Sequence, residues 1–138
     1  MKTDRCCLGI AALLSLTSPS FAHHSFAPFD LSREVTVAGV VKDVQFTNPH
    51  VWIQLLVPDG KGGETEWSVE GGAPGMMIRA GWKGSTLKSG DRVTLTMHPL
   101  RDGNPSGSLV RVTVPDGRVL GSGGGPPPPP SAAAPAKR

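Results

Sequence analysis

Residues 34–46 (EVTVAGVVKDVQF) decide the fold of this chain. Apolar and polar residues alternate along the segment, which is typical of a β-strand with one buried face. The apolar set changes parity, from odd positions before Ala38-Gly39 to the even positions of Val40 and Val44 after it. An extra residue at a glycine predicts a β-bulge or a sharp bend. A bent strand of this length can take part in both sheets of a small barrel.

The segments that follow alternate in the same way and are separated by turn signals such as Asp59-Gly60 and Asp102-Gly103. The predicted strands cover residues 34–46, 50–57, 64–70, 91–98 and 108–114, with a short edge piece at 118–120. Residues 74–80 begin with a proline and are followed by a glycine, which predicts one or two helical turns. Alternation predicts a shared core of Val51, Ile53, Leu55, Trp67, Val93, Leu95, Val110 and Val112.

This order of elements predicts an all-β fold, a small five-stranded OB-like barrel with one short helix between strands 3 and 4. A plain β-sandwich is the main alternative. It leaves the short helix and the bent first strand unexplained, so we prefer the barrel.

The N-terminus has the pattern of a secretory signal peptide. A basic start precedes an apolar stretch at residues 8–16, which is too short to span a bilayer. Small residues then fit the −3 and −1 positions of a cleavage site after Ala22. Removal of residues 1–22 would leave a chain that starts at His23 and has no membrane anchor. We therefore expect a periplasmic or secreted protein.

The mature chain divides into an N-terminal arm (23–33), the barrel domain (34–120) and a Gly/Pro/Ala-rich tail (121–138) that we expect to be disordered. Of the 138 residues, about 85–95 can fold into a domain, which excludes a multidomain enzyme and a Rossmann or TIM-type fold. Both cysteines lie in the signal segment, so thiolate metal sites and cysteine catalysis are excluded. Removing residues 1–22 lowers the formal charge from +3 to +2, and so small a charge disfavours nucleic-acid binding.

Six short motifs are spread over the mature domain. They are HHSFAPFD (23–30), TNPHVW (47–52), EWSVEGGAP (66–74), RAGW (79–82), LKSGDRV (87–93) and HPLRDG (98–103). Together they resemble a family of small exported bacterial proteins that is known only as a domain of unknown function. The resemblance covers residues 23–120. It implies export and a single β domain, and it supplies no catalytic residue.

The candidate metal ligands are the four histidines, His23, His24, His50 and His98. In an OB-like barrel the loops after strands 1 and 4 flank one end, so His50 and His98 are predicted neighbours. After cleavage His23 would offer its amine and its imidazole to one ion, a chelate suited to Cu(II), with His24 in reserve. The alternative is that these histidines only cap strand ends or lie in a frayed terminus.

Two functions of different classes follow. The first is a small exported binding module. Cu(II) is the most specific ligand that we can suggest for it, and copper is the one cofactor suggested. The second is a non-catalytic interaction domain that docks a protein partner through the strand 1–2 and 4–5 loops, with Trp52, Arg101 and Asp102 as contact residues. An enzyme is the weakest of the functions considered, because the chain has no nucleophile motif and no convincing pair of carboxylates.

Trp52 can be interpreted in two ways. It lies on the outer face of its predicted strand together with His50, where it can stack on a ligand. Alternatively the arm covers it through Phe26 and Phe29. We expect the second, because a hydrophobic arm must pack against something.

Overall fold

The computed structural model describes residues 27–123, and the predicted signal segment, the start of the arm and most of the tail lie outside this range. The elements in the described range are β1 (Val35–Gln45), β2 (Trp52–Pro58), β3 (Glu64–Glu70), α1 (Pro74–Arg79), β4 (Arg92–Pro99), β5 (Ser106–Thr113) and β6 (Val119–Gly121). Each boundary lies within two residues of the boundary predicted from the sequence. No helix in this range has the length and apolar character needed to cross a membrane.

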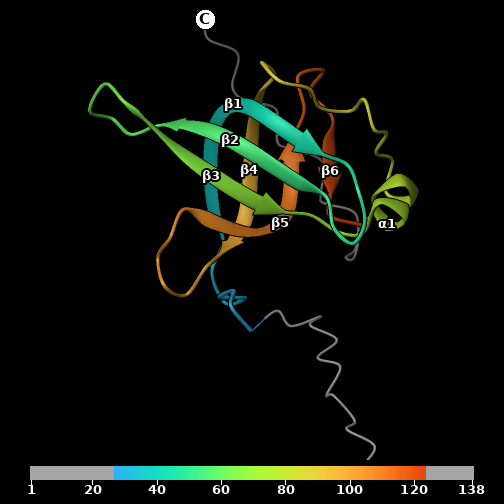
Figure 1. The fold of residues 1–138 in the computed structure, drawn as a ribbon, viewed down its shortest axis with the longest axis horizontal. Coiled ribbons are helices and arrows are strands. Elements are labelled where there is room, and N and C mark those ends of the chain that lie inside the picture. The colour runs from blue at the N-terminus through green and yellow to red at the C-terminus, as the bar shows by residue number, and fades with distance from the viewer. Residues whose placement is uncertain (1–26, 124–138) are drawn as a thin grey trace, which may run out of the picture.

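The strands form one sheet in the order β3-β2-β1-β4-β5-β6, with β1 between β2 and β4, and the sheet closes into a five-stranded barrel (Figure 1). Its first half, from Val35 to Val40, pairs antiparallel with β4, and its second half, from Val40 to Gln45, pairs antiparallel with β2. Strand β3 then pairs in parallel with the start of β5, which completes the circuit β1-β2-β3-β5-β4. The short helix α1 lies between β3 and β4 in the chain. The predicted OB-like architecture is therefore confirmed.

The bend in β1 requires the glycine at position 39. A Cβ atom at Gly39 would lie 2.5 Å from the backbone carbonyl oxygen of Leu56, a distance that real Cβ contacts essentially never show. Backbone cannot move aside as a flexible side chain can, so any other residue would push β2 away from β1.

The extra residue of β1 is Lys42, so the prediction of a bulge at Ala38-Gly39 is wrong by a few positions. Val41 pairs with Leu55 and the next paired residue is Asp43, which leaves Lys42 between them. The inward face therefore keeps its odd parity as far as Val41, which is 1% exposed. Val40 and Val41 are adjacent and both apolar, so alternation alone cannot show at which of them the inward face changes parity.

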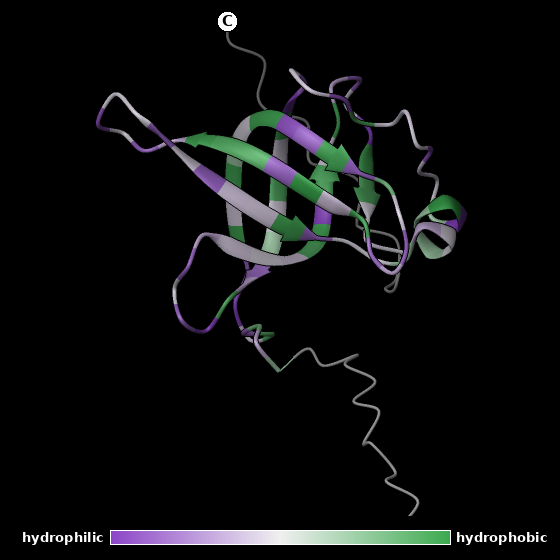
Figure 2. Cartoon of the chain, viewed as in Figure 1, coloured by the Kyte–Doolittle hydropathy of each residue, from purple (hydrophilic) through white to green (hydrophobic). Residues whose placement is uncertain are grey.

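The core is a single cluster of buried side chains inside the barrel and under α1. Its members are Val41, Val51, Ile53, Leu55, Val69, Met77, Trp82, Leu87, Val93, Leu95, Met97, Leu109, Val112, Val114 and Leu120. Figure 2 shows the corresponding alternation of hydrophobic and hydrophilic residues along the strands. Of the predicted core, Trp67 packs against this cluster while partly buried.

Val110 was predicted to be buried with the core, and the structure shows it half-buried and outside the cluster. On β5, Arg111 pairs with Thr96 and Leu109 pairs with Met97, so Val110 is an extra residue between two paired positions. The irregularity turns Leu109 inward in its place, with 3% exposure.

Replacing Gly39 by alanine should lower the free energy of unfolding by about 1–3 kcal/mol, because the new methyl group meets backbone rather than open space. The matched control is Gly84→Ala, since no atom lies within 4 Å of the position that its Cβ would take. That variant should stay within about 0.5 kcal/mol of the parent. Urea unfolding of the three proteins measures the difference, and equal loss in both variants would remove the argument for the bend.

Candidate functional site

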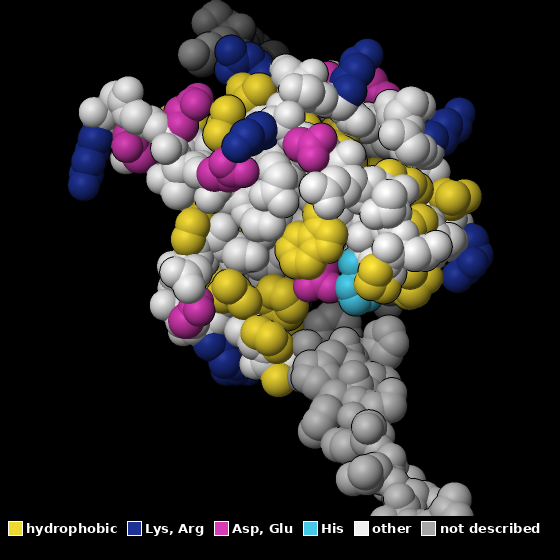
Figure 3. Space-filling view, viewed as in Figure 1, with side chains coloured by type: hydrophobic (Ala, Val, Ile, Leu, Met, Phe, Trp, Pro, Cys, Tyr) yellow, Lys and Arg dark blue, Asp and Glu magenta, His cyan; other side chains and the backbone are white. Residues whose placement is uncertain are grey.

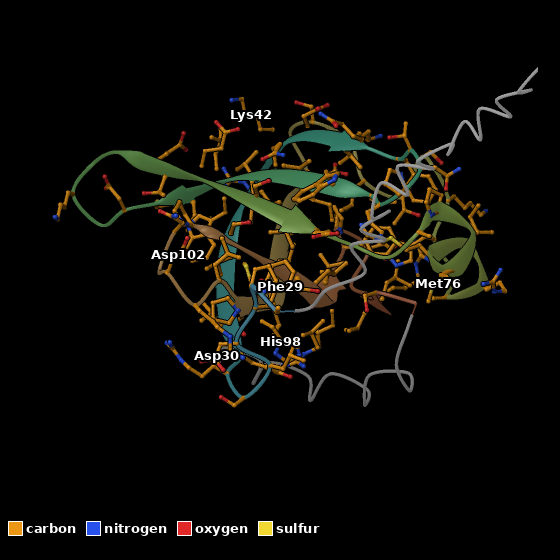
Figure 4. The ribbon with its side chains drawn as sticks, turned by 60° about the horizontal axis from the view of Figure 1, so that its bottom comes forward. Phe29, Asp30, Lys42, Met76, His98 and Asp102 are labelled. Atoms are coloured by element: carbon orange, nitrogen blue, oxygen red, sulfur yellow. The ribbon has the colours of Figure 1, made fainter. Side chains whose placement is uncertain are left out.

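Residues 27–33 form the described part of the arm and lie along the end of β4. Phe29 forms a β-bridge with Leu100, and the backbone N–H of Asp30 donates to the carbonyl oxygen of Pro99 at 2.8 Å. The Phe29 side chain is 7% exposed, so it anchors the arm by burying an aromatic ring. Figure 4 shows Phe29, Asp30 and His98 close together at one end of the barrel, away from Met76 in α1.

Arg101 binds the part of the arm that precedes Phe29. Its backbone N–H donates to the carbonyl oxygen of Pro28 at 3.0 Å, and its guanidinium Nε donates to the carbonyl oxygen of Ala27 at 3.2 Å. The HHSFAPFD and HPLRDG motifs are therefore structural partners. Arg101 was predicted as a docking residue, and in the structure it binds the chain's own arm.

Asp30 closes a tight turn at the end of the arm. Its carboxylate Oδ1 accepts hydrogen bonds from the hydroxyl of Ser32 at 2.6 Å and from the backbone N–H of Ser32 at 3.2 Å. The backbone N–H of Arg33 donates to the Asp30 carbonyl oxygen at 3.1 Å. The hydrogen bond from the Ser32 hydroxyl is the main reason that the pKa of Asp30 lies below its ordinary value.

His98 on β4 is bonded to the residue that follows this turn. Its Nδ1 lies 2.8 Å from the carbonyl oxygen of Arg33. A carbonyl oxygen only accepts, so Nδ1 carries a hydrogen and donates it, and the neutral ring has its lone pair on Nε2. The fold therefore selects one tautomer of His98.

His50 comes just before β2, where Val51 ties the chain to the end of β3. The Val51 N–H donates to the Gly72 carbonyl oxygen at 3.1 Å, and the Gly71 N–H donates to the Val51 carbonyl oxygen at 2.7 Å. This pairing brings His50 Nδ1 into contact with carboxylate Oε1 of Glu70. A metal ion would then bind this ring through Nε2.

His50 precedes β2 and His98 lies on β4, and these two strands are not neighbours. Around the closed barrel, however, Glu70 of β3 pairs with Ser108 of β5, and Ser108 pairs with His98. Because His50 contacts Glu70, only β5 separates the strand that it contacts from the strand of His98. The expectation that both rings reach one shared point stays a prediction. Within residues 27–123, no group of three or more His, Cys, Asp or Glu side chains could hold a metal ion.

His23 and His24 lie outside the described residues, as does Phe26. Phe29 is placed against Leu100 at the end of β4, which is not a neighbour of β2 in the barrel. The part of the arm that the structure describes therefore packs on β4, and Trp52 lies on β2.

Sequence reasoning missed the role of Glu70, which alternation placed on a solvated face. Its side chain is 22% exposed and contacts His50. Asp102, predicted as a docking residue, accepts hydrogen bonds from the backbone N–H and the side-chain Nδ2 of Asn104 at 3.0 and 2.8 Å. Its carboxylate therefore shapes its own loop.

A protein family described only as a family of unknown function, DUF6152, matches residues 11–109. The chain belongs to this family. Membership of a family of unknown function, expected from the resemblance, is thereby confirmed, and DUF6152 carries no assigned activity. No curated protein and no solved structure matches the chain. Any function must therefore be argued from the geometry of this member of DUF6152.

Acidification should release the turn at Asp30. Because the pKa of Asp30 is lowered in the folded chain, its carboxylate stabilises the docked arm above the ordinary aspartate pKa. This contribution is lost as the pH falls through the depressed pKa. An NMR titration that follows the Ser32 amide should show this transition in the parent and none in Asp30→Asn, which cannot ionise. A Ser32 transition at the ordinary aspartate pKa would contradict the hydrogen-bonded turn.

Proposed function

We propose that this protein is a small exported binding module that takes up a transition-metal ion, with Cu(II) as the best-matched ion. The observation that carries the proposal is the hydrogen bond from His98 Nδ1 to the Arg33 carbonyl oxygen. Histidines that bind metals through one ring nitrogen almost always donate the other ring N–H to a carbonyl or carboxylate group. His98 has this arrangement, and the contact between His50 and Glu70 offers the carboxylate version of it.

The length of the arm would allow an N-terminus at His23 to reach His98. Ala27 is held by Arg101, three residues beyond His98, or about 10 Å along an extended chain. His23 precedes Ala27 by four residues, which span at most about 14 Å. A chain that turns back at Ala27 can therefore place His23 beside His98.

The resulting donor set suits Cu(II). His98 supplies Nε2, and His23 supplies its imidazole and its α-amine, which gives three nitrogen ligands. His24 supplies a fourth. Cu(II) favours such tetragonal nitrogen sites, and an α-amine with a pKa of about 7.7–8.0 loses its proton to a metal at little cost.

This donor set is complete without His50, which contacts Glu70 on β3, with β5 between that strand and His98. The alternative function, an interaction domain that docks a partner through the loops after β1 and β4, would use Arg101 and Asp102. Both side chains bond within the chain's own arm and loop, which favours the metal-binding proposal.

Processing can be tested first. The exported protein should begin at His23, because the small residues before it fit the pockets of signal peptidase. Intact-mass analysis of protein recovered from the periplasm gives the first residue. A retained signal segment, or a first residue beyond Ser25, would remove the amine ligand and with it the proposed site.

Replacing His98 by alanine should weaken Cu(II) binding by about tenfold or more, because a preorganised ligand is lost. Adding one glycine before His23 should have a similar effect, since it displaces the amine. His50→Ala is the matched control and should stay within about twofold of the parent. Calorimetric titration of the cleaved proteins measures the affinities, and electron paramagnetic resonance counts the nitrogen ligands.

Equal affinity in all these proteins would mean that the histidines bind copper only as surface groups. A loss in His50→Ala as large as that in His98→Ala would restore the shared site expected from the sequence.

A further inference from the structure

Trp52 differs from the other two tryptophans in its surroundings. Trp82 is 2% exposed, and its indole N–H donates to the Gly121 carbonyl oxygen at 2.8 Å. Trp67 packs against the core cluster. Trp52 precedes the fully buried Ile53 on β2, so its side chain lies on the opposite, outer side of the strand, and it is not part of the core cluster. Trp52 is half-buried, so part of its indole is covered by neighbouring side chains and part stays accessible on the outer face of the barrel.

Polar side chains surround Trp52 on the same outer face. The register places Glu70 of β3 on one side of it and Gln45 of β1 on the other. His50 and Gln54 lie two residues before and two residues after it, and therefore on the same face of β2. Figure 3 shows hydrophobic, acidic and histidine side chains side by side on this face of the molecule.

These polar groups are already held in position. Gln54 Nε2 donates to the hydroxyl of Ser68 at 3.1 Å, and His50 contacts Oε1 of Glu70. Ser68 is in turn fixed by β5, because the Ser106 hydroxyl donates to its carbonyl oxygen at 2.6 Å. A carboxylate and an amide oxygen each accept more than one hydrogen bond, so Glu70 and Gln54 keep capacity for a ligand. Preorganised groups lose little side-chain entropy on binding.

The charge of this face limits the kind of ligand. Asp43 pairs with Gln54 across β1 and β2, and Glu66 lies on β3 in an ion pair with Lys42 at 2.6 Å. With Glu70, the face carries three carboxylates and one lysine among the residues named. Phosphate groups would be repelled by it, whereas an uncharged polyol would not.

We propose that the outer face of β2 and β3 around Trp52 binds an uncharged oligosaccharide. The apolar C–H face of a sugar ring would stack on the indole, which combines a large apolar surface with a polar edge. The hydroxyl groups at the rim of the sugar would donate to Glu70 and to the amide oxygens of Gln45 and Gln54. This site lies on different strands from His98 and does not depend on metal binding.

The test uses chitohexaose as the probe and the mature chain as the protein. Chitohexaose should bind in calorimetry and shift the tryptophan fluorescence. Trp52→Ala should weaken binding by about tenfold or more, and Glu70→Gln by about threefold to tenfold. Trp52→Phe should keep most of the affinity and lose the fluorescence response, which separates loss of stacking from loss of folding. Near-ultraviolet circular dichroism checks that each variant is folded.

The matched control is Glu34→Gln, which removes a carboxylate that pairs with Arg111 at 3.1 Å, away from Trp52. Its affinity should stay within about twofold of the parent. The single-stranded hexanucleotide dT6 serves as the anionic comparison and should not compete. The proposal fails if chitohexaose does not bind, if Trp52→Ala binds it as the parent does, or if dT6 binds more tightly.

Discussion

The close approach of the Gly39 backbone to the carbonyl of Leu56 is the constraint on which the rest of the structure depends. A straight strand of the length of β1 would hold β2 and β4 in one open sheet, with β3 and β5 too far apart to pair. The missing side chain lets β1 bend, so that its two halves pair with β4 and β2 in turn. Closure follows, and closure sets β5 beside β3. The place of each loop and of the arm is a consequence of that circuit.

The residue pattern within each segment was enough to predict the helix and the strands. It could not predict the bulges, which depend on pairing between distant segments. Alternation located each strand to within two residues, because burial of one face acts on every second side chain. It wrongly placed Val40 and Val110 on the inward face in place of Val41 and Leu109, because a bulge shifts parity by one residue and cannot be recognised in the sequence when two apolar residues are adjacent.

The histidine partners could not be predicted from local pattern. The bond between His98 and Arg33 joins residues 65 positions apart, and it forms only because the arm returns along β4. The contact of His50 with Glu70 depends on the register of β2 and β3. Candidate residues were therefore visible in the sequence, whereas the ring nitrogen that each one engages was not.

The short motifs of this chain form pairs of contacting segments. The arm motif binds the HPLRDG loop through Phe29 and Arg101, and the TNPHVW segment binds the glycines after β3 through Val51. Trp82 of the RAGW motif closes the far side by donating to Gly121. In this chain these motifs therefore serve to assemble the fold, and they hold the few side chains that are available for chemistry in position.

Strands β3 and β5 pair over a short stretch, and this affects the tendency of the protein to polymerise through its sheet edge. Three residue pairs make the junction, from Ser68–Ser106 to Glu70–Ser108, so in the described part of the chain the first four residues of β3 have no strand partner on that side. An open edge of this kind invites another chain to extend the sheet. Glu64 lies exposed on this segment, and its charge would face the same charge on a second copy, whereas Glu66 is already paired with Lys42. The edge therefore carries an electrostatic protection against edge-to-edge polymerisation at Glu64, and this protection weakens when that carboxylate is neutralised.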